Sequence, residues 1–428
     1  MWAGSGLPGL GLSGVVDAEV MAVLYGRFVD PRTAGGVRLA SGRMLPEVVL
    51  GRRVSTRTCA DGSVAEPVAA FDVTFSPAKS VSVLWATASD EQVRKVVADC
   101  HEDAVSEALA YLEANAGHTR AGVSGVRRMA TSGFIIAQFR HRTARSTRPG
   151  ERVGDPQLHS HCAILNRVRG VDGRWRTLDG EAIYRHAHAA GALYAAVLER
   201  ELSARLGVRW VAPADPVPMR EIEGVPSAVV RYFSSRRAQV LEAFEALLVE
   251  WHRHNGRSPT RDERAGMLDE ATVRSRRAKR KGDVDLLAHW RSQLSADEQA
   301  AVDAAVDNVG EGAGDGGRLP AGSMELREAV FTALHEQRAW WTRTHVYAEV
   351  ARLIADPTGE AIEIEVERIV GHCLELEPDR DYQYAQLDKT KFTSEVITAR
   401  SSPRRRATSS FSPPRPGRSP WPPHMHHR

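Results

Sequence analysis

"QFRHRTARSTRPGERVGDPQLHSHCAILNRV" (residues 138–168) contains three histidines, a belt of arginines and, at its end, an apolar run that is typical of a β-strand. We predict strands over residues 133–141 and 158–168, joined by a loop over residues 142–158. A loop of this length inside a compact domain is often functional. The segment therefore predicts two neighbouring strands with a candidate functional loop between them.

The three histidines, His141, His159 and His161, predict a metal site. Antiparallel pairing of the two strands places His141 beside the other two, which share one face because side chains alternate along a strand. Three neutral imidazoles around one point form a divalent-metal site with open positions, which suits a Lewis acid acting on an anionic phosphate. Asp72, on the polar face of a predicted strand over residues 70–76, is a candidate to orient one imidazole. Unrelated histidines and an ordinary surface aspartate are the plainer interpretations.

Helices are predicted on both sides of these strands. The segment "SPAKSVSVLWA" favours a short helix. Residues 89–117 follow the 3.6-residue apolar period of an amphipathic helix, with Ser89 and Gln92 as a capping box and Gly117 at the end. Another helix, or pair of helices, ends at Gly207. The chain therefore mixes strands and helices.

Composition divides the 428 residues into successive parts. They are a core over 1–225, a helical segment over 226–308, a flexible linker over 309–323, a small helical, winged-helix-like domain over 324–398 and a disordered basic tail over 399–428.

Cysteine usage and charge narrow the class of protein. The four cysteines have no C-x-x-C spacing, which argues for a reducing compartment and against a thiolate zinc site. No secretion signal or long apolar run is present, so we expect a soluble cytoplasmic protein without membrane insertion. Two basic runs, residues 140–176 and 274–281, lie in a body that is otherwise net acidic. This pattern predicts a polyanionic partner.

Four motifs stand out together: "FDVTFSPAKSVSVLWA", "FRHRTAR", "GDPQLHSHCAILNRV" and "DGRWRTLDG". With them, roughly residues 1–300 resemble the conjugative relaxases of the TrwC/TraI type, the MobF group of HUH endonucleases. It implies an α+β fold: a palm of antiparallel strands, akin to RRM-like and ferredoxin-like folds, flanked by helices. The helical segment would be an appendage that closes over single-stranded DNA. The family nicks plasmid DNA at a transfer origin through a tyrosine that stays linked to the 5′ end.

The resemblance also assigns roles to residues. His141, His159 and His161 would bind the metal, which could be Mg, Mn or Zn. Asp72 would orient a histidine and assist proton transfer at the nucleophile. Single-stranded DNA at a transfer origin would be the partner, with other conjugation proteins as further candidates. The expected DNA-binding residues are Lys79, Arg140, Arg142, Arg145, Arg148, Arg152 and Trp175. Ser160 stands where the family often has threonine.

Two family features are not found in this sequence. The nucleophilic tyrosine of the family lies upstream of the segment that "WAGSGLPGLGLSGVVD" resembles, and Tyr25 lies in a predicted helix where tyrosine usually packs. No G-x-x-x-x-G-K-[ST] motif occurs, so neither ATP binding nor helicase activity is expected. We therefore expect a relaxase domain truncated at both ends. The alternatives are a remnant that binds single-stranded DNA without cutting it, and a three-histidine zinc hydrolase.

Overall fold

The computed structural model describes most of the chain. The described residues are 1–52, 56–58, 62, 64–65, 67–147, 153–211, 219–276, 285–306, 317–337, 340–376 and 392–393. Two predicted DNA-binding arginines, Arg148 and Arg152, lie outside them, as does the predicted basic tail over 399–428.

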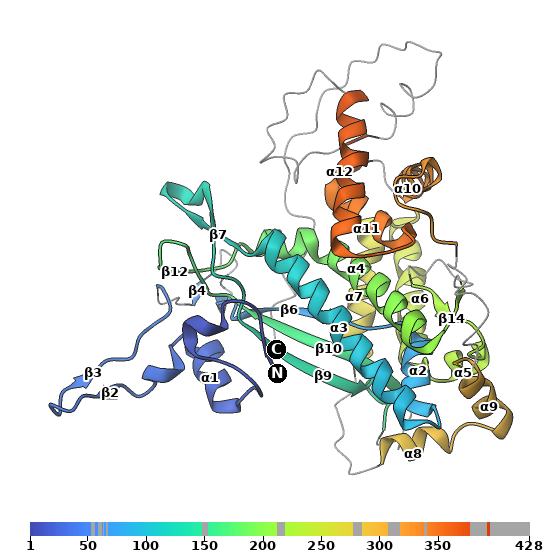
Figure 1. The fold of residues 1–428 in the computed structure, drawn as a ribbon, viewed down its shortest axis with the longest axis horizontal. Helices are drawn as coiled ribbons and strands as arrows, with labels where there is room; N and C mark the ends of the chain where they lie inside the picture. Colours follow the sequence, from blue (N-terminus) through green and yellow to red (C-terminus); the bar gives the residue numbers. More distant parts are fainter. Residues whose placement is uncertain are drawn as a thin grey trace.

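The centre of the fold is a four-stranded antiparallel sheet (Figure 1). Across the sheet the strands are β1 (Trp2–Ala3), β9 (Ile136–Thr143), β10 (Pro156–Leu165) and β6 (Ala70–Phe75). The predicted antiparallel pairing is confirmed, because His159 lies opposite His141 in the register of β10 with β9. With helices on the sheet, the chain has the predicted α+β fold.

Alternation along the strands gives the sheet two different faces. On one face, Phe75, Ile136 and Ile164 join the main apolar core, which three helices complete. They are α2 (Lys79–Thr87), α3 (Glu91–Ala116) and α4 (Gly180–Leu206). On the other face, Ile135 and Leu165 pack against helix α1 (Ala18–Arg27) and the segment that leads into it.

Helix ends follow the local sequence, with one correction. Asp90, not the predicted pair Ser89 and Gln92, caps α3: its carboxylate accepts a hydrogen bond from the Gln92 backbone N–H at 2.7 Å. Ser89 instead donates to Asp303 at 2.7 Å. Gly207 ends α4 as predicted, with φ of 64°, a left-handed conformation that glycine adopts without steric cost.

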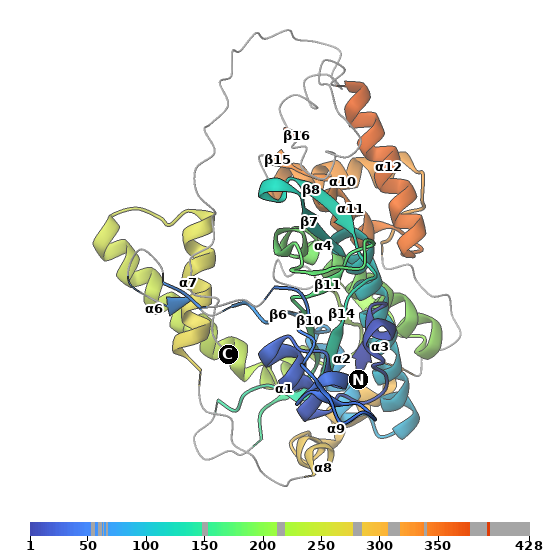
Figure 2. The ribbon, with the colours of Figure 1, turned by 90° about the vertical axis from the view of Figure 1, so that its left-hand side faces the viewer.

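Between residues 226 and 306 the described part of the chain is mainly helical. It contains α5 (Ser227–Tyr232), α6 (Ser235–Asn255), α7 (Arg261–Arg274), α8 (Leu286–Arg291) and α9 (Ala296–Ala304). Helices α6 and α7 form a hairpin with a small core of its own, which includes Phe244 and Met267. Figure 2 shows this hairpin on one side of the sheet and α3 on the other. The hairpin therefore lies on the side that α3 and α4 leave uncovered.

Three further helices join the main core, the middle one directly against α4 and the other two against the middle one. They are α10 (Met324–Gln337), α11 (Arg343–Leu353) and α12 (Gly359–Leu376). Tyr347 of α11 packs against Tyr111 of α3, with ring centroids 4.4 Å apart. Their apolar core is thus continuous with that of the sheet and its helices.

The remaining strands form short two-stranded pairs. They are β2 (Val37–Arg38) with β3 (Met44–Leu45), β4 (Arg57–Thr58) with β5 (Val64–Ala65), β7 (His118–Ala121) with β8 (Arg127–Ala130), β11 (Val168–Arg169) with β12 (Trp175–Arg176), β13 (Trp210–Val211) with β14 (Glu221–Ile222), and β15 (Trp340–Trp341) with β16 (Phe392–Thr393). None of the helices in the described part of the chain has the length and apolar character needed to span a bilayer.

Candidate metal centre

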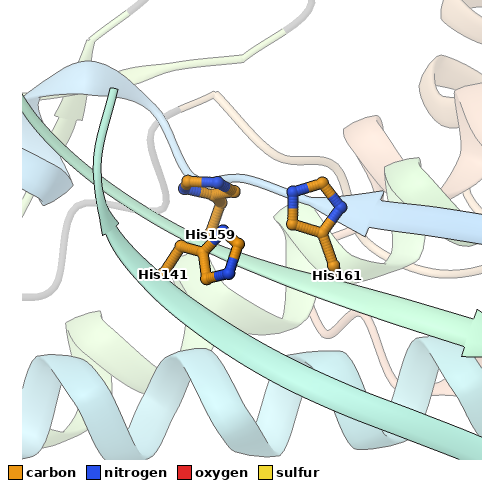
Figure 3. A group of neighbouring side chains, drawn as sticks. All are labelled: His141, His159 and His161. Carbon is orange, nitrogen blue, oxygen red and sulfur yellow. The ribbon is translucent and has the colours of Figure 1, made fainter. Parts of the chain in front are cut away.

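The structure brings the three predicted histidines together on the sheet face opposite α3 (Figure 3). His141 comes from β9, and His159 and His161 come from β10. The ring centroids are 5.0 to 5.2 Å apart, and one nitrogen from each ring lies within 4.8 Å of the other two. All three side chains are half-buried, so a ligand can approach them from solvent.

Hydrogen bonds from behind fix which ring nitrogens face the centre. His161 Nδ1 lies 2.8 Å from Asp72 Oδ2 and 3.0 Å from Thr74 Oγ1. His159 Nδ1 lies 2.9 Å from the Gln157 carbonyl oxygen. A carboxylate and a carbonyl only accept, so each Nδ1 carries the proton and each Nε2 keeps its lone pair. This is the arrangement that metal-binding histidines usually have.

The donor set fits a divalent transition metal. Three imidazoles supply three neutral nitrogen ligands and leave further coordination positions open. Asp72 is 55% exposed and touches His161 rather than the centre itself, as the strand pattern predicted. Thr74 shares the polar face of β6 with Asp72, so the same alternation could have identified it from the sequence.

A buried polar cluster lies directly beneath the histidines. Ser160 points to the helical face, where its hydroxyl lies 2.8 Å from His101 Nε2 of α3. His101 Nδ1 lies 2.7 Å from the Tyr194 hydroxyl of α4. Burial, together with nearby Arg140 and His159, lowers the pKa of His101 to about 3, so this imidazole is neutral. The sequence analysis missed His101, although it lies on the apolar stripe of its helix.

Lys79 braces the start of β10. Its ammonium donates to the Pro156 carbonyl at 2.9 Å and to Gln157 Oε1 at 2.7 Å. Burial lowers the pKa of Lys79 to about 8, although Asp155 and Glu221 act in the opposite direction. Lys79 was predicted to contact DNA, but in the structure its nitrogen binds the backbone next to His159.

Two arginines of the belt that the structure describes, Arg140 and Arg142, do not lie beside the histidines. Arg140 and Arg142 alternate with His141 along β9 and so lie on the opposite face, where Arg140 pairs with Glu102 at 2.6 Å. Arg145 lies by the start of the α6–α7 hairpin: burial, with the charges of Arg145 and Arg276, lowers the pKa of Arg236. The idea that all the arginines surround the metal is therefore corrected for Arg140 and Arg142.

Two aromatic residues lie along the sheet beyond the histidines, toward the end of β10 that lacks them. Trp175, a predicted base-stacking residue, is half-buried in the apolar cluster around α1, beyond the end of β10 that lacks histidines. The Tyr25 hydroxyl donates to the Ala163 carbonyl at 2.8 Å and accepts from the Ala137 N–H at 3.1 Å. Burial raises the pKa of Tyr25 well above its usual range. Tyr25 is thus part of the packing, as the sequence predicted.

Comparisons with known proteins agree with this geometry. The family model described as TrwC relaxase matches residues 1–296. The multifunctional conjugation protein TraI of Escherichia coli (strain K12) is 27% identical over 376 residues, which cover 84% of this chain and 18% of TraI. A second TraI from Escherichia coli is 28% identical, with the same coverage of this chain and of TraI. The chain thus spans about a fifth of the length of these curated relatives.

A solved structure gives the same result. The metal-bound structure of the conjugative relaxase TrwC in complex with OriT DNA has a TM-score of 0.50 and 28% sequence identity to this chain. It covers 70% of this chain, which covers 88% of it. Because the family model matches more than half of the sequence, this chain belongs to the TrwC relaxase family.

Proposed function

We propose that this chain binds single-stranded DNA at a plasmid transfer origin and holds a divalent metal for phosphodiester chemistry on it. The observation that carries the proposal is the cluster of His141, His159 and His161 on an open sheet face, with Asp72 behind it. Similarity to TrwC, whose structure is described as metal-bound and in complex with OriT DNA, supports the same conclusion. A bound metal would supply Lewis-acid polarisation of a phosphate oxygen.

The side chains around the site would perform separate tasks. His141, His159 and His161 would hold the metal. Asp72 would accept the proton of His161 Nδ1 in a hydrogen bond, so that Nε2 faces the metal as the ligand atom. Three imidazoles without a directly ligating carboxylate favour zinc or another transition metal over magnesium, which prefers oxygen ligands. We therefore propose zinc or manganese, in that order.

The DNA would lie between the histidine face and the α6–α7 hairpin. Both are on the side of the sheet away from α3 (Figure 2). Arg145, Arg236 and Arg276 gather at the start of the hairpin, where like charges repel one another. A phosphate would relieve this repulsion. The arginines that support DNA binding are thus the ones next to the hairpin.

Tyr25 would not be the nucleophile of any strand transfer. Its oxygen is held between two backbone groups, and ionising it in this buried position is unfavourable. An attacking oxygen needs both access to the phosphate and an accessible ionised or base-activated state. We therefore expect metal and DNA binding that does not depend on the Tyr25 hydroxyl.

A zinc hydrolase for a small substrate has less support. A cavity of about 520 Å³ lies beside α1, lined by residues that include Tyr25, Phe28, Val49 and Pro67. It is at the opposite end of the sheet from the histidines. The histidine cluster is half-buried on an open face, which suits a DNA strand better than a small substrate.

Calorimetry with Zn²⁺ and Mn²⁺ tests the metal site. The wild-type chain should bind one ion, and His159→Ala/His161→Ala should abolish binding. The control is His252→Ala/His254→Ala, which removes two exposed histidines with the same spacing from α6. Unchanged affinity in the first variant, or equal losses in both variants, would contradict the proposal.

Salt dependence tests the DNA site. Arg145→Ala should reduce the slope of log K against log salt for single-stranded DNA by roughly 0.7, the value for one phosphate contact. Arg140→Ala is the control, because Arg140 pairs with Glu102 on the helical face. Equal slopes for wild type and Arg145→Ala would place the DNA elsewhere.

A further inference from the structure

We infer that Tyr194, His101 and Ser160 form a buried positioning relay, which fixes strand β10 from behind and so sets where His159 and His161 present their ligand atoms. The inference rests on the proposed function, because it assumes that the histidines bind a metal. None of the three relay residues faces the metal centre. They would act only through the strand.

The relay crosses from helix to sheet in two hydrogen bonds. The Tyr194 hydroxyl of α4 lies 2.7 Å from His101 Nδ1, and His101 Nε2 lies 2.8 Å from Ser160 Oγ. Ser160 and His101 are fully buried and Tyr194 is 2% exposed. The two rings also meet edge to face, with centroids 5.6 Å apart. The imidazole is therefore held at both nitrogens inside a buried core.

The proton positions along the relay follow from chemistry. A neutral imidazole has one N–H and one lone pair. The single lone pair of a neutral imidazole accepts from only one of the two hydroxyls beside it, and we assign Tyr194 as that donor because a phenol is a stronger donor than the Ser160 alcohol. Tyr194 then donates to Nδ1, which leaves the imidazole proton on Nε2, where it donates to Ser160 Oγ. In this arrangement the hydroxyl of residue 160 is the acceptor for a buried donor.

The relay meets β10 where strand pairing is weakest. The register of β10 with β9 shifts between Pro156 and His159, and pairing with β6 begins only at Ser160. The backbone at His159 therefore depends less on the sheet ladder than the backbone further along. A hydrogen bond from α3 to Ser160 would fix the strand between the two metal-binding side chains.

Loss of the hydroxyl would move the metal ligands. Without an acceptor at residue 160, the His101 Nε2–H would be buried and unsatisfied, a state that proteins avoid. The chain could relieve it by shifting β10 or by admitting water beneath the sheet. Either response displaces His159 and His161 relative to His141.

The matched variants are Ser160→Thr and Ser160→Val, which add nearly the same volume and differ in the hydroxyl. Ser160→Thr should bind Zn²⁺ within a fewfold of wild type. Ser160→Val should bind it roughly ten- to hundredfold more weakly, the usual loss when the groups that support metal ligands are removed. With Co²⁺ as the probe, its d–d absorption should change in Ser160→Val and be unchanged in Ser160→Thr.

Ser80→Ala separates positioning from general loss of stability. The Ser80 hydroxyl is also buried, and it accepts a hydrogen bond from the Ile222 N–H at 2.8 Å. This variant should lose stability but keep its affinity for Zn²⁺. If Ser160→Val binds Zn²⁺ as tightly as Ser160→Thr while the wild type binds it, the relay is refuted and the metal site stands. If the wild type itself does not bind Zn²⁺, Mn²⁺ or Co²⁺, the proposed function fails first.

Nitrogen NMR of histidine-labelled protein provides an independent check without metal. His101 should carry its proton on Nε2, with Nδ1 unprotonated. A proton on Nδ1 would overturn the relay as drawn, because Ser160 would then be a donor and no longer the required acceptor.

Discussion

Replacing Tyr25 with phenylalanine tests the structural role of its hydroxyl. The oxygen lies between β9 and β10, where it bridges the Ala137 N–H and the Ala163 carbonyl. These two residues lie opposite each other in the register of the strands. Phenylalanine keeps the ring and its packing against Trp2, and removes only the bridge.

The expected cost follows from the two groups left without a partner. The Tyr25 side chain is 7% exposed and Ala137 is fully buried, so water cannot readily replace the lost oxygen. An unsatisfied buried backbone group costs about 1–3 kcal/mol. Two such groups, the Ala137 N–H and the Ala163 carbonyl, lose their partner, and a small movement of the strands toward each other would recover part of this cost. We therefore expect Tyr25→Phe to lower the free energy of unfolding by about 2–4 kcal/mol.

Urea denaturation followed by far-UV circular dichroism measures this change, with Tyr184→Phe as the matched control. Tyr184 is 60% exposed, and its loss of a hydroxyl should change stability by less than about 0.5 kcal/mol. Affinity for Zn²⁺ and for single-stranded DNA should be unchanged in Tyr25→Phe. An unaltered unfolding midpoint, together with loss of a covalent protein–DNA product, would refute the reasoning and make Tyr25 the nucleophile.

Three further outcomes are expected. Asp72→Asn should weaken Zn²⁺ binding roughly tenfold or more by loosening His161, and calorimetry showing wild-type affinity would contradict that role. The pKa of Lys79 is about 8 in the folded chain, against an ordinary 10.5. Between pH 8 and 10.5 the unfolded chain therefore keeps the Lys79 proton that the folded chain has lost. The free energy of unfolding of wild type, relative to that of Lys79→Met, should therefore rise across this pH range by up to about 3 kcal/mol. A difference between the two proteins that stays constant with pH in urea denaturation would disprove it. Gly133 has φ of 102°, and an added Cβ would meet Glu113 Oε1 at 2.8 Å, so Gly133→Ala should destabilise the chain by more than about 1 kcal/mol in thermal unfolding. Gly191→Ala, in the open on α4, is its control and should be neutral or stabilising.

Local periodicity was sufficient for most of the sheet and helices. The alternation in β6 put Asp72 on the polar face, and the apolar period over residues 89–117 predicted α3. The spacing of His159 and His161 placed both imidazoles on one face, because a strand repeats every two residues. Their distance from His141 required one assumption, antiparallel pairing, which the long connecting loop made reasonable.

The same alternation contradicts one prediction, that the arginines beside His141 surround the metal. Arg140 and Arg142 flank His141, so on a strand they must point away from it. Treating the arginines as one belt ignored this rule. The position of Arg145 was different, because a loop residue has no fixed side and only the packing of the loop on α6 decides it.

Long-range packing decided the features that no local pattern contains. The sequence places His101, Ser160 and Tyr194 in three separate elements, and a buried polar side chain gives no periodic signal of its partner. Likewise, the sequence predicts that Tyr25 packs in a helix, but not that its hydroxyl bridges two strands more than 100 residues away. The sequence by itself determined the strands, the helices and the three candidate ligands, because the patterns that predict them involve residues only a few positions apart. Only the tertiary structure decided what supports them, because those contacts join residues that are distant along the chain.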